Sequence, residues 1–186
     1  FTSIALDSYG RPHISSHNAD NHYLSYAYMD ADSTWHVEDV CPGGYYSSLA
    51  IDSQDRPRIA HYDPDLHDLV YTYWTGSQWA SYTVDSDGDV GAYTSLALDR
   101  YGKAHISYRQ EGVLKYVYQS WSGWQAETVD EGASLGGDVS LALDESDNPH
   151  MSYLDGTNHD LKYAYRNASV WHIETVESEG QVGAHS

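Results

Sequence analysis

The chain has 186 residues, with 9 Lys and Arg against 28 Asp and Glu, and its formal net charge is −19. This balance excludes nucleic acid as a partner, because a protein needs a basic surface to neutralise phosphates. No apolar run approaches the roughly 20 residues that span a bilayer, so the sequence predicts no membrane partner. Hydrophobic residues make up 40% of the chain, and its 18 Tyr and 6 Trp favour β-strands in a globular fold.

A short motif of Ser, an apolar residue, Ala, a second apolar residue and Asp occurs four times along the chain. Its copies are Ser3–Asp7, Ser48–Asp52, Ser95–Asp99 and Ser140–Asp144. A tryptophan follows each copy at a similar distance, at Trp35, Trp79, Trp124 and Trp171. Two markers that keep one period predict four repeats of about 46 residues. The expected boundaries of the repeats are 1–46, 47–93, 94–138 and 139–186.

Each repeat is expected to form four short strands in the same order. In the first repeat these are Ser3–Asp7, Pro12–Ser16, Leu24–Tyr28 and the run that begins at Trp35. The runs are rich in β-branched and aromatic residues and are bounded by turn formers such as Asp and Gly. No run shows the 3.6-residue period of a helix. The sequence therefore predicts an all-β protein made of four-stranded antiparallel sheets, each one a blade of a β-propeller.

The turn before the first of these tryptophans, Asp30–Trp35, is similar to the Asp-box pattern Ser-x-Asp-x-Gly-x-Thr-Trp, from which the other three turns depart. With four blade repeats, the chain resembles bacterial β-propeller repeat proteins of the sialidase-like, or BNR-repeat, kind. The resemblance implies the propeller fold. Sialidase-type catalysis would need an arginine cluster and a nucleophilic Tyr, and the arginines here are too few in each repeat. We therefore assign no catalytic residue.

The two ends of the chain fall at repeat boundaries. Phe1–Ser3 aligns with Tyr93–Ser95, and Gly183–Ser186 aligns with Gly91–Thr94. Four blades with no strand left over are expected to form half of an eight-bladed ring, which a homodimer closes by packing blade faces together. The alternatives are a closed ring of four blades and a piece of a longer chain.

Two positions of the repeat suggest a ligand-binding face. The loop between the second and third strands carries His22, His67 and His159, and the entry to an inner strand carries Tyr46 and Tyr93. In a propeller these loops and entries share one face. Aromatic rings beside Asp, Asn and His side chains suit sugar rings and their hydroxyls. We expect Tyr46, Tyr93, His22, His67 and His159 to bind a glycan or a peptide.

Acidic residues at alternate positions are the candidates for a metal site. They are Asp63, Asp65, Asp85, Asp87 and Asp89. Such oxygen ligands suit calcium, although neither run matches an EF-hand loop. A solvated acidic rim is the alternative interpretation. No other cofactor is expected.

Two recurring side chains have structural explanations. Asp7, Asp52, Asp99 and Asp144 are expected to cap the turn after the inner strand. His13 recurs as His105 and His150, but the second repeat has Arg58 there, and an arginine does not ligate metals. This position is therefore expected to pack and to form hydrogen bonds.

The sequence favours a non-catalytic propeller module that binds carbohydrate in the manner of a lectin, in an extracellular setting. One alternative is a piece of a propeller glycoside hydrolase or polysaccharide lyase. A second is a structural or engineered repeat protein without a ligand.

Overall fold

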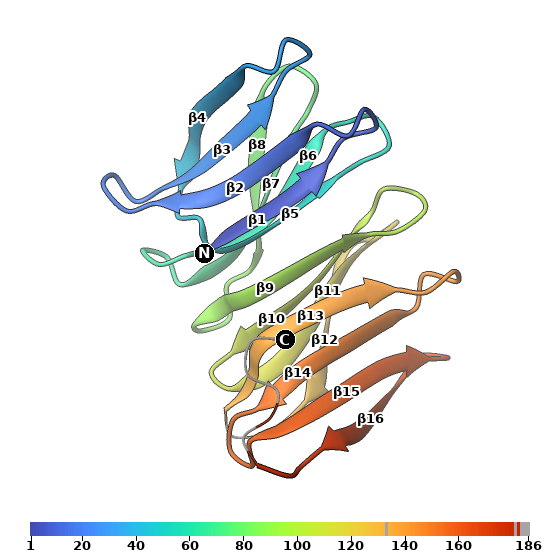
Figure 1. Ribbon diagram of the computed structural model, residues 1–186. Helices are drawn as coiled ribbons and strands as arrows, with labels where there is room; N and C mark the ends of the chain where they lie inside the picture. The colour runs from blue at the N-terminus through green and yellow to red at the C-terminus, as the bar shows by residue number, and fades with distance from the viewer. Residues whose placement is uncertain (133, 181, 183–186) are drawn as a thin grey trace. The chain divides into compact units, whose positions relative to one another are not determined.

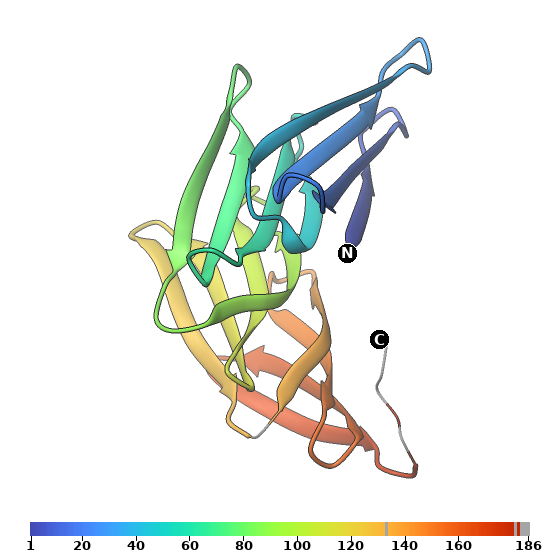
Figure 2. The same ribbon diagram turned by 90° about the vertical axis from the view of Figure 1, so that its left-hand side faces the viewer.

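The structure is a computed structural model that describes residues 1–132, 134–180 and 182. The chain divides into two compact units, Phe1–Thr94 and Ser95–Ser186. Each unit contains two four-stranded sheets, and the part of the chain described has no helix (Figures 1 and 2). The aligned end Gly183–Ser186 lies outside the described residues. A membrane-spanning apolar helix is absent from the described residues.

The strands follow the expected order within every repeat. The first unit holds β1 (Thr2–Leu6), β2 (Pro12–Asn18), β3 (Tyr23–Met29), β4 (Trp35–Pro42), β5 (Tyr45–Ile51), β6 (Pro57–Asp63), β7 (Asp68–Trp74) and β8 (Trp79–Asp85). Next come β9 (Val90–Leu98), β10 (Ala104–Gln110), β11 (Val113–Ser120), β12 (Gly123–Asp130), β13 (Leu135–Leu143), β14 (Pro149–Asp155), β15 (Asp160–Asn167) and β16 (Val170–Glu177). Each sheet pairs its four strands in chain order. Neighbouring strands such as β1 and β2, or β6 and β7, pair in antiparallel orientation, so the prediction of four-stranded antiparallel sheets is confirmed.

The inner strands start before the boundaries expected from the repeat. They begin at Tyr45, Val90 and Leu135, ahead of the predicted repeat starts at 47, 94 and 139. The pairing register shifts between Tyr45 and Ser48, and again between Gly137 and Ser140. Tyr46 has a left-handed backbone, with φ of 52°. Such a β-bulge lets the first residues of the inner strand pair with the second strand before the regular pairing begins at the serine.

The recurring aspartate caps the turn after the inner strand, as predicted. Asp7 accepts backbone hydrogen bonds from Tyr9 (2.9 Å) and Arg11 (2.8 Å) through one carboxylate oxygen. The same pair of bonds recurs at Asp52, Asp99 and Asp144. A short carboxylate side chain can bond two nearby N–H groups, which holds a tight turn in place. The four aspartates are therefore structural.

The recurring histidine links this turn to the third strand. His13 Nε2 lies 3.7 Å from an Asp7 carboxylate oxygen, and His13 Nδ1 is hydrogen-bonded to the Tyr26 hydroxyl. The second repeat replaces the histidine with Arg58, whose Nη2 lies 2.6 Å from Asp52. Both side chains contact the capping carboxylate, so the prediction of a packing and hydrogen-bonding position is confirmed.

Tryptophans pack between neighbouring sheets of one unit. Trp79 contacts Tyr26 of the preceding sheet edge-on, with ring centroids 5.0 Å apart. In the second unit Trp171 makes the same contact with Tyr116 at 5.3 Å. Apolar side chains such as Leu24 and Leu49 form the core beside the first pair. Large rings suit this place because they cover much apolar area at the junction of two sheets.

A serine hydroxyl also joins the two sheets of each unit. Ser95 Oγ accepts a hydrogen bond from Leu141 N (3.0 Å), as Ser3 Oγ does from Leu49 N (3.0 Å). Ser95→Ala would leave this backbone N–H without its acceptor, so we expect the free energy of unfolding to fall by about 1 kcal/mol. Urea denaturation measures the change. Ser140→Ala is the matched control, because Ser140 holds the same repeat position and is exposed. Equal losses in both variants would contradict the assignment.

Candidate functional site

Three of the five predicted ligand residues come together in the first unit. Tyr46 lies at the start of β5, Tyr93 lies in β9, and their ring centroids are 4.6 Å apart. Phe1 packs on Tyr46 at 4.2 Å, and Tyr62 lies 6.3 Å from Tyr46. We name Phe1, Tyr46, Tyr62 and Tyr93 the aromatic cluster. His67 adjoins it, with its ring 6.3 Å from that of Tyr62.

Hydrogen bonds give the aromatic cluster a polar edge. The Tyr62 hydroxyl donates to an Asp89 carboxylate oxygen (2.8 Å) and is hydrogen-bonded to His67 Nδ1 (2.8 Å). Burial of the hydroxyl and its bond to Asp89 raise the pKa of Tyr62, so this phenol stays protonated. His67 and Asp89 are exposed. This edge offers a ring nitrogen, a hydroxyl and a carboxylate to a polar ligand.

The sequence prediction left Tyr62 out of the site, although it begins the same loop as His67. Tyr62 ends up beside Asp89, which was expected only as a calcium candidate. The two residues are 27 positions apart in the chain. Their contact depends on how β6 and the linker before β9 fold together, and a repeat comparison contains no such information.

His22 makes a ring contact with a residue outside the aromatic cluster. Its ring is 5.8 Å from that of His17, which in turn packs on Tyr45 at 3.8 Å. His159 belongs to the second unit. Within the first unit, the ring contacts described join three of the five predicted residues, Tyr46, Tyr93 and His67.

The repetition of this histidine has a backbone explanation. His22, His67 and His159 all have left-handed φ values, between 60° and 62°. Histidine is among the residues that adopt this conformation more readily than most. The carbonyl oxygens of His22 and His67 accept hydrogen bonds from Gly43 N and Val90 N, where the chain enters β5 and β9, and that of His159 accepts one from Val182 N. The histidines thus fix the connection between repeats, and the ring of His67 also contacts the aromatic cluster.

The acidic calcium candidates lie in two segments of the first unit. Asp63 ends β6 and Asp65 is in the β6–β7 loop, and Asp85 ends β8 and is followed in the β8–β9 linker by Asp87 and Asp89. Asp63 accepts a backbone bond from Asp65 (3.0 Å), and Asp85 accepts one from Asp87 (3.2 Å). Groups of three or more His, Cys, Asp or Glu side chains arranged to hold a metal are absent from the described residues.

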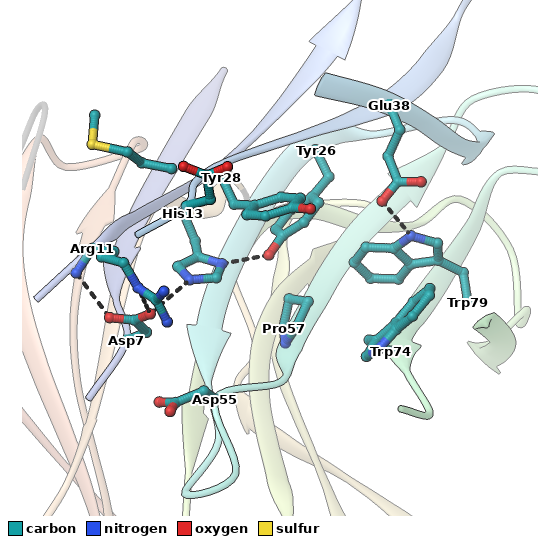
Figure 3. A pocket seen from close by; sticks show the side chains of 12 residues that line it. Asp7, Arg11, His13, Tyr26, Tyr28, Glu38, Asp55, Pro57, Trp74 and Trp79 are labelled. Carbon is teal, nitrogen blue, oxygen red and sulfur yellow. Dashed lines mark hydrogen bonds and ion pairs between the residues drawn. The ribbon is translucent and has the colours of Figure 1, made fainter. Parts of the chain in front are cut away.

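A pocket of about 320 Å³ lies at the opposite end of the first unit's strands, where the capping turns are. The lining residues are Asp7, Arg11, His13, Tyr26, Tyr28, Met29, Asp30, Glu38, Asp55, Pro57, Trp74 and Trp79. Figure 3 shows Trp74 below Trp79 on one side and the pair of Asp7 and Arg11 on the other. Trp79 Nε1 donates to Glu38 Oε1 (3.0 Å), and the two indoles pack edge-on at 5.6 Å.

The pKa values of Asp7 and His13, two buried side chains of this pocket, are both shifted downward. Burial acts to raise the pKa of Asp7, but hydrogen bonds from Arg11 and from two backbone N–H groups leave that pKa below its usual value. Burial lowers the pKa of His13 in spite of the nearby Asp7 carboxylate. Near neutral pH the pocket therefore holds an ionised Asp7 and a neutral His13.

This pocket was not predicted from the sequence. A signal was present at the position of the third strand that pairs with the recurring tryptophan, which is Met29, Trp74, Gln119 and Arg166 in the four repeats. The chemistry of that position differs in every repeat, whereas the tryptophan paired with it is constant. This variation indicates that the fold does not require one particular side chain at this position, so its side chain can be one that contacts a ligand.

The chain matches no protein-family model and no curated protein. A protein of unknown function from Dyadobacter fermentans has a similar structure, with a TM-score of 0.67 and 10% sequence identity, over 94% of this chain and 68% of that one. A virginiamycin B lyase from Staphylococcus aureus matches with a TM-score of 0.62 and 10% identity, over 97% of this chain and 57% of the lyase.

NanB sialidase from Streptococcus pneumoniae also matches, with a TM-score of 0.53 and 18% identity, over 82% of this chain and 28% of the sialidase. The four sheets are blades of a β-propeller. The resemblance to sialidase-like propeller proteins is thus confirmed at the level of the fold. The chain spans about half of the lyase and less than a third of the sialidase, and identities this low carry the fold alone.

Proposed function

We propose that this propeller chain is a non-catalytic binding module for carbohydrate, with the aromatic cluster and its polar edge as the ligand face. The observation that carries the proposal is the contact between Tyr46 and Tyr93 beside the hydrogen-bonded Tyr62, His67 and Asp89. Aromatic faces stack on the C–H faces of sugar rings, and neighbouring polar groups bond the hydroxyls. An extracellular protein that meets free glycans fits this role.

The ion pairs of the arginines support a binding function without catalysis. Sialidase-type chemistry needs a cluster of arginines for the substrate carboxylate. Here five of the six arginines are engaged by carboxylates of the chain itself: Arg11 by Asp7, Arg56 and Arg58 by Asp52, Arg100 by Asp147 and Arg166 by Glu127. The raised pKa of Tyr62 likewise suits a hydroxyl that donates hydrogen bonds.

A second candidate is one part of a propeller hydrolase or lyase, favoured by the structural likeness to a sialidase and a lyase. Residues beyond this chain would then complete the active site. An activity screen on sialosides and polyuronates tests this candidate. Turnover that is lost in Tyr62→Phe would favour the enzyme over the binding module.

A glycan array followed by titration calorimetry tests the binding module. We expect Tyr46→Ala and Tyr93→Ala each to weaken binding of the selected glycan about tenfold, because each removes a stacking ring. Tyr101→Ala is the control, since Tyr101 is exposed and belongs to a turn of the second unit. Circular dichroism checks that the variants fold. If no glycan binds, or if Tyr46→Ala binds as well as Tyr101→Ala, the proposal fails.

A further inference from the structure

The two units of the chain build similar junctions between their sheets, which differ in the charged side chains around the pocket. Strand register places Glu38 opposite Tyr26 in the first unit and Glu127 opposite Tyr116 in the second. In both units an indole N–H donates to this glutamate at 3.0 Å, from Trp79 to Glu38 and from Trp171 to Glu127. The carboxylate and the indole are therefore common to both junctions.

The second unit fills its junction with a guanidinium group. Arg166 Nη2 donates to Glu127 Oε1 at 2.6 Å, and the guanidinium lies 5.4 Å from the centre of the Tyr118 ring. The Arg166 side chain is only 20% exposed. A cation held by a carboxylate and an aromatic face in a partly desolvated place is a favourable arrangement.

The first unit has the same carboxylate and an equivalent ring, Tyr28, which stacks on His36 at 4.9 Å, but it has no arginine at this place. Register places Trp74 opposite Trp79 where Arg166 is opposite Trp171, and Tyr28 holds the position of Tyr118. The open pocket lies beside Trp74 (Figure 3). Its lining includes the four carboxylates of Asp7, Asp30, Glu38 and Asp55. Arg11 is bound to one of these carboxylates, Asp7, at 2.6 Å, and His36 Nε2 is bound to another, Asp30, at 2.7 Å.

A second difference between the two units leaves the pocket of the first unit with a further excess of negative charge. Asp147 of the second unit binds the guanidinium of Arg100 at 2.6 Å. The equivalent Asp55 receives only neutral donors, from the backbone N–H and the hydroxyl of Ser8 (both 2.7 Å). Two guanidinium groups of the second unit are thus replaced by uncharged side chains around the pocket of the first.

We propose that this pocket binds a guanidinium group supplied by a ligand, at the place that Arg166 occupies in the second unit. The ligand's guanidinium donates to the Glu38 carboxylate and lies against the Tyr28 ring, with Trp74 and Trp79 covering its aliphatic chain. Guanidinium is favoured over ammonium because its planar fork matches a carboxylate and stacks on aromatic faces. The group comes from a small arginine derivative or from an arginine side chain of a peptide. The pocket lies at the opposite end of the strands from the aromatic cluster, so this inference does not depend on glycan binding.

Titration calorimetry with agmatine and with the peptide acetyl-Gly-Arg-Gly-amide tests the proposal on the full chain. We expect one agmatine site per chain, and at least about tenfold weaker binding of N-carbamoylputrescine, in which an uncharged ureido group replaces the guanidinium group. If the peptide binds more tightly than agmatine, the ligand is an arginine of a protein partner; if agmatine binds more tightly, the ligand is a small molecule. Failure of both probes to bind, or equal binding of N-carbamoylputrescine and agmatine, would overturn the proposal.

Three variants locate the site. Glu38→Gln keeps an oxygen acceptor for Trp79 but removes the charge, and we expect it to weaken agmatine binding about tenfold. Glu174→Gln is the matched control, because Glu174 holds the same repeat position in the last sheet and is exposed. Trp74→Arg should abolish binding by supplying the cation from the chain, as Arg166 does. Agmatine binding that is unchanged in both Glu38→Gln and Trp74→Arg would place the ligand elsewhere and refute the assignment.

Discussion

Acidification from pH 7 to pH 4 is expected to lower the free energy of unfolding by roughly 3 kcal/mol through His61 alone. This side chain is fully buried in the first unit. Its Nδ1 accepts a hydrogen bond from the backbone N–H of Gly44 (3.1 Å), and its Nε2 is bonded to the Thr72 hydroxyl (3.0 Å). A proton on Nδ1 would displace the Gly44 bond and place a charge in an apolar interior.

The direction of the effect follows from the two pKa values. Burial lowers the pKa of His61 from 6.5 to about 4 in the folded protein, although the nearby Asp63 acts against this. Between these values the unfolded chain binds a proton at this residue and the folded chain does not. Stability is therefore lost as pH falls from 6.5 to 4. Burial lowers the pKa of His13 and His105 too, and these residues act in the same direction.

Urea denaturation at pH 7, 5.5 and 4 measures this loss. His61→Gln should flatten the dependence of stability on pH, even if it lowers stability at every pH. His172→Gln is the control, because His172 is exposed in the last strand. Protonation of some of the 28 carboxylates at low pH reduces their mutual repulsion, which by itself would raise the free energy of unfolding. If stability at pH 4 equals or exceeds that at pH 7, or if His61→Gln leaves the slope unchanged, the buried histidine does not control acid sensitivity.

Self-association is the second large effect that we expect. Ile4 and Leu6 of β1 are 64% and 60% exposed, whereas Leu49 and Leu141, which hold the position of Ile4 in the second and fourth sheets, are 6% and 8% exposed. In those two sheets the preceding sheet of the same unit covers the face. The last sheet has exposed apolar side chains of its own on β16, at Val170, Ile173 and Val176.

We propose that a second copy of the chain covers the exposed face of the first sheet. The exposed face of the first sheet has the same apolar positions as the faces of the second and fourth sheets, which a neighbouring sheet covers. A sheet from a second copy of the chain would therefore fit this face. Two copies related by a twofold axis would each use the first and last sheets and form an eight-bladed ring. Large apolar faces of this kind are rarely left open in monomers.

Light scattering at micromolar concentration tests the assembly, with an expected mass of about 42 kDa, twice the 20.8 kDa chain. Folding would be linked to association, so the melting temperature should rise with protein concentration. Ile4→Glu should shift the mass to that of one chain. Leu66→Glu should not, because Leu66 is exposed in the β6–β7 loop. A folded wild-type species of about 21 kDa with a concentration-independent melting temperature would contradict the dimer.

Local features of this protein follow from its sequence. The capping role of Asp7 could be predicted, because a carboxylate bonds N–H groups two and four residues ahead in its own turn. The strand order could be predicted as well, because each repeat pairs neighbouring segments joined by short turns. The exchange of His13 for Arg58 indicated correctly that this position packs and forms hydrogen bonds.

The composition of the sites was decided by tertiary structure. His22, His67 and His159 are equivalent in sequence, yet only His67 adjoins Tyr62 and Asp89. Glu38 and Trp79 meet although 41 residues separate them, and the pocket beside them is lined by Trp74, which holds the position of Arg166 in the second unit. Repeats specify the fold through contacts close in sequence. Which side chains meet across two packed sheets depends on the register of both sheets and on the size of each side chain between them.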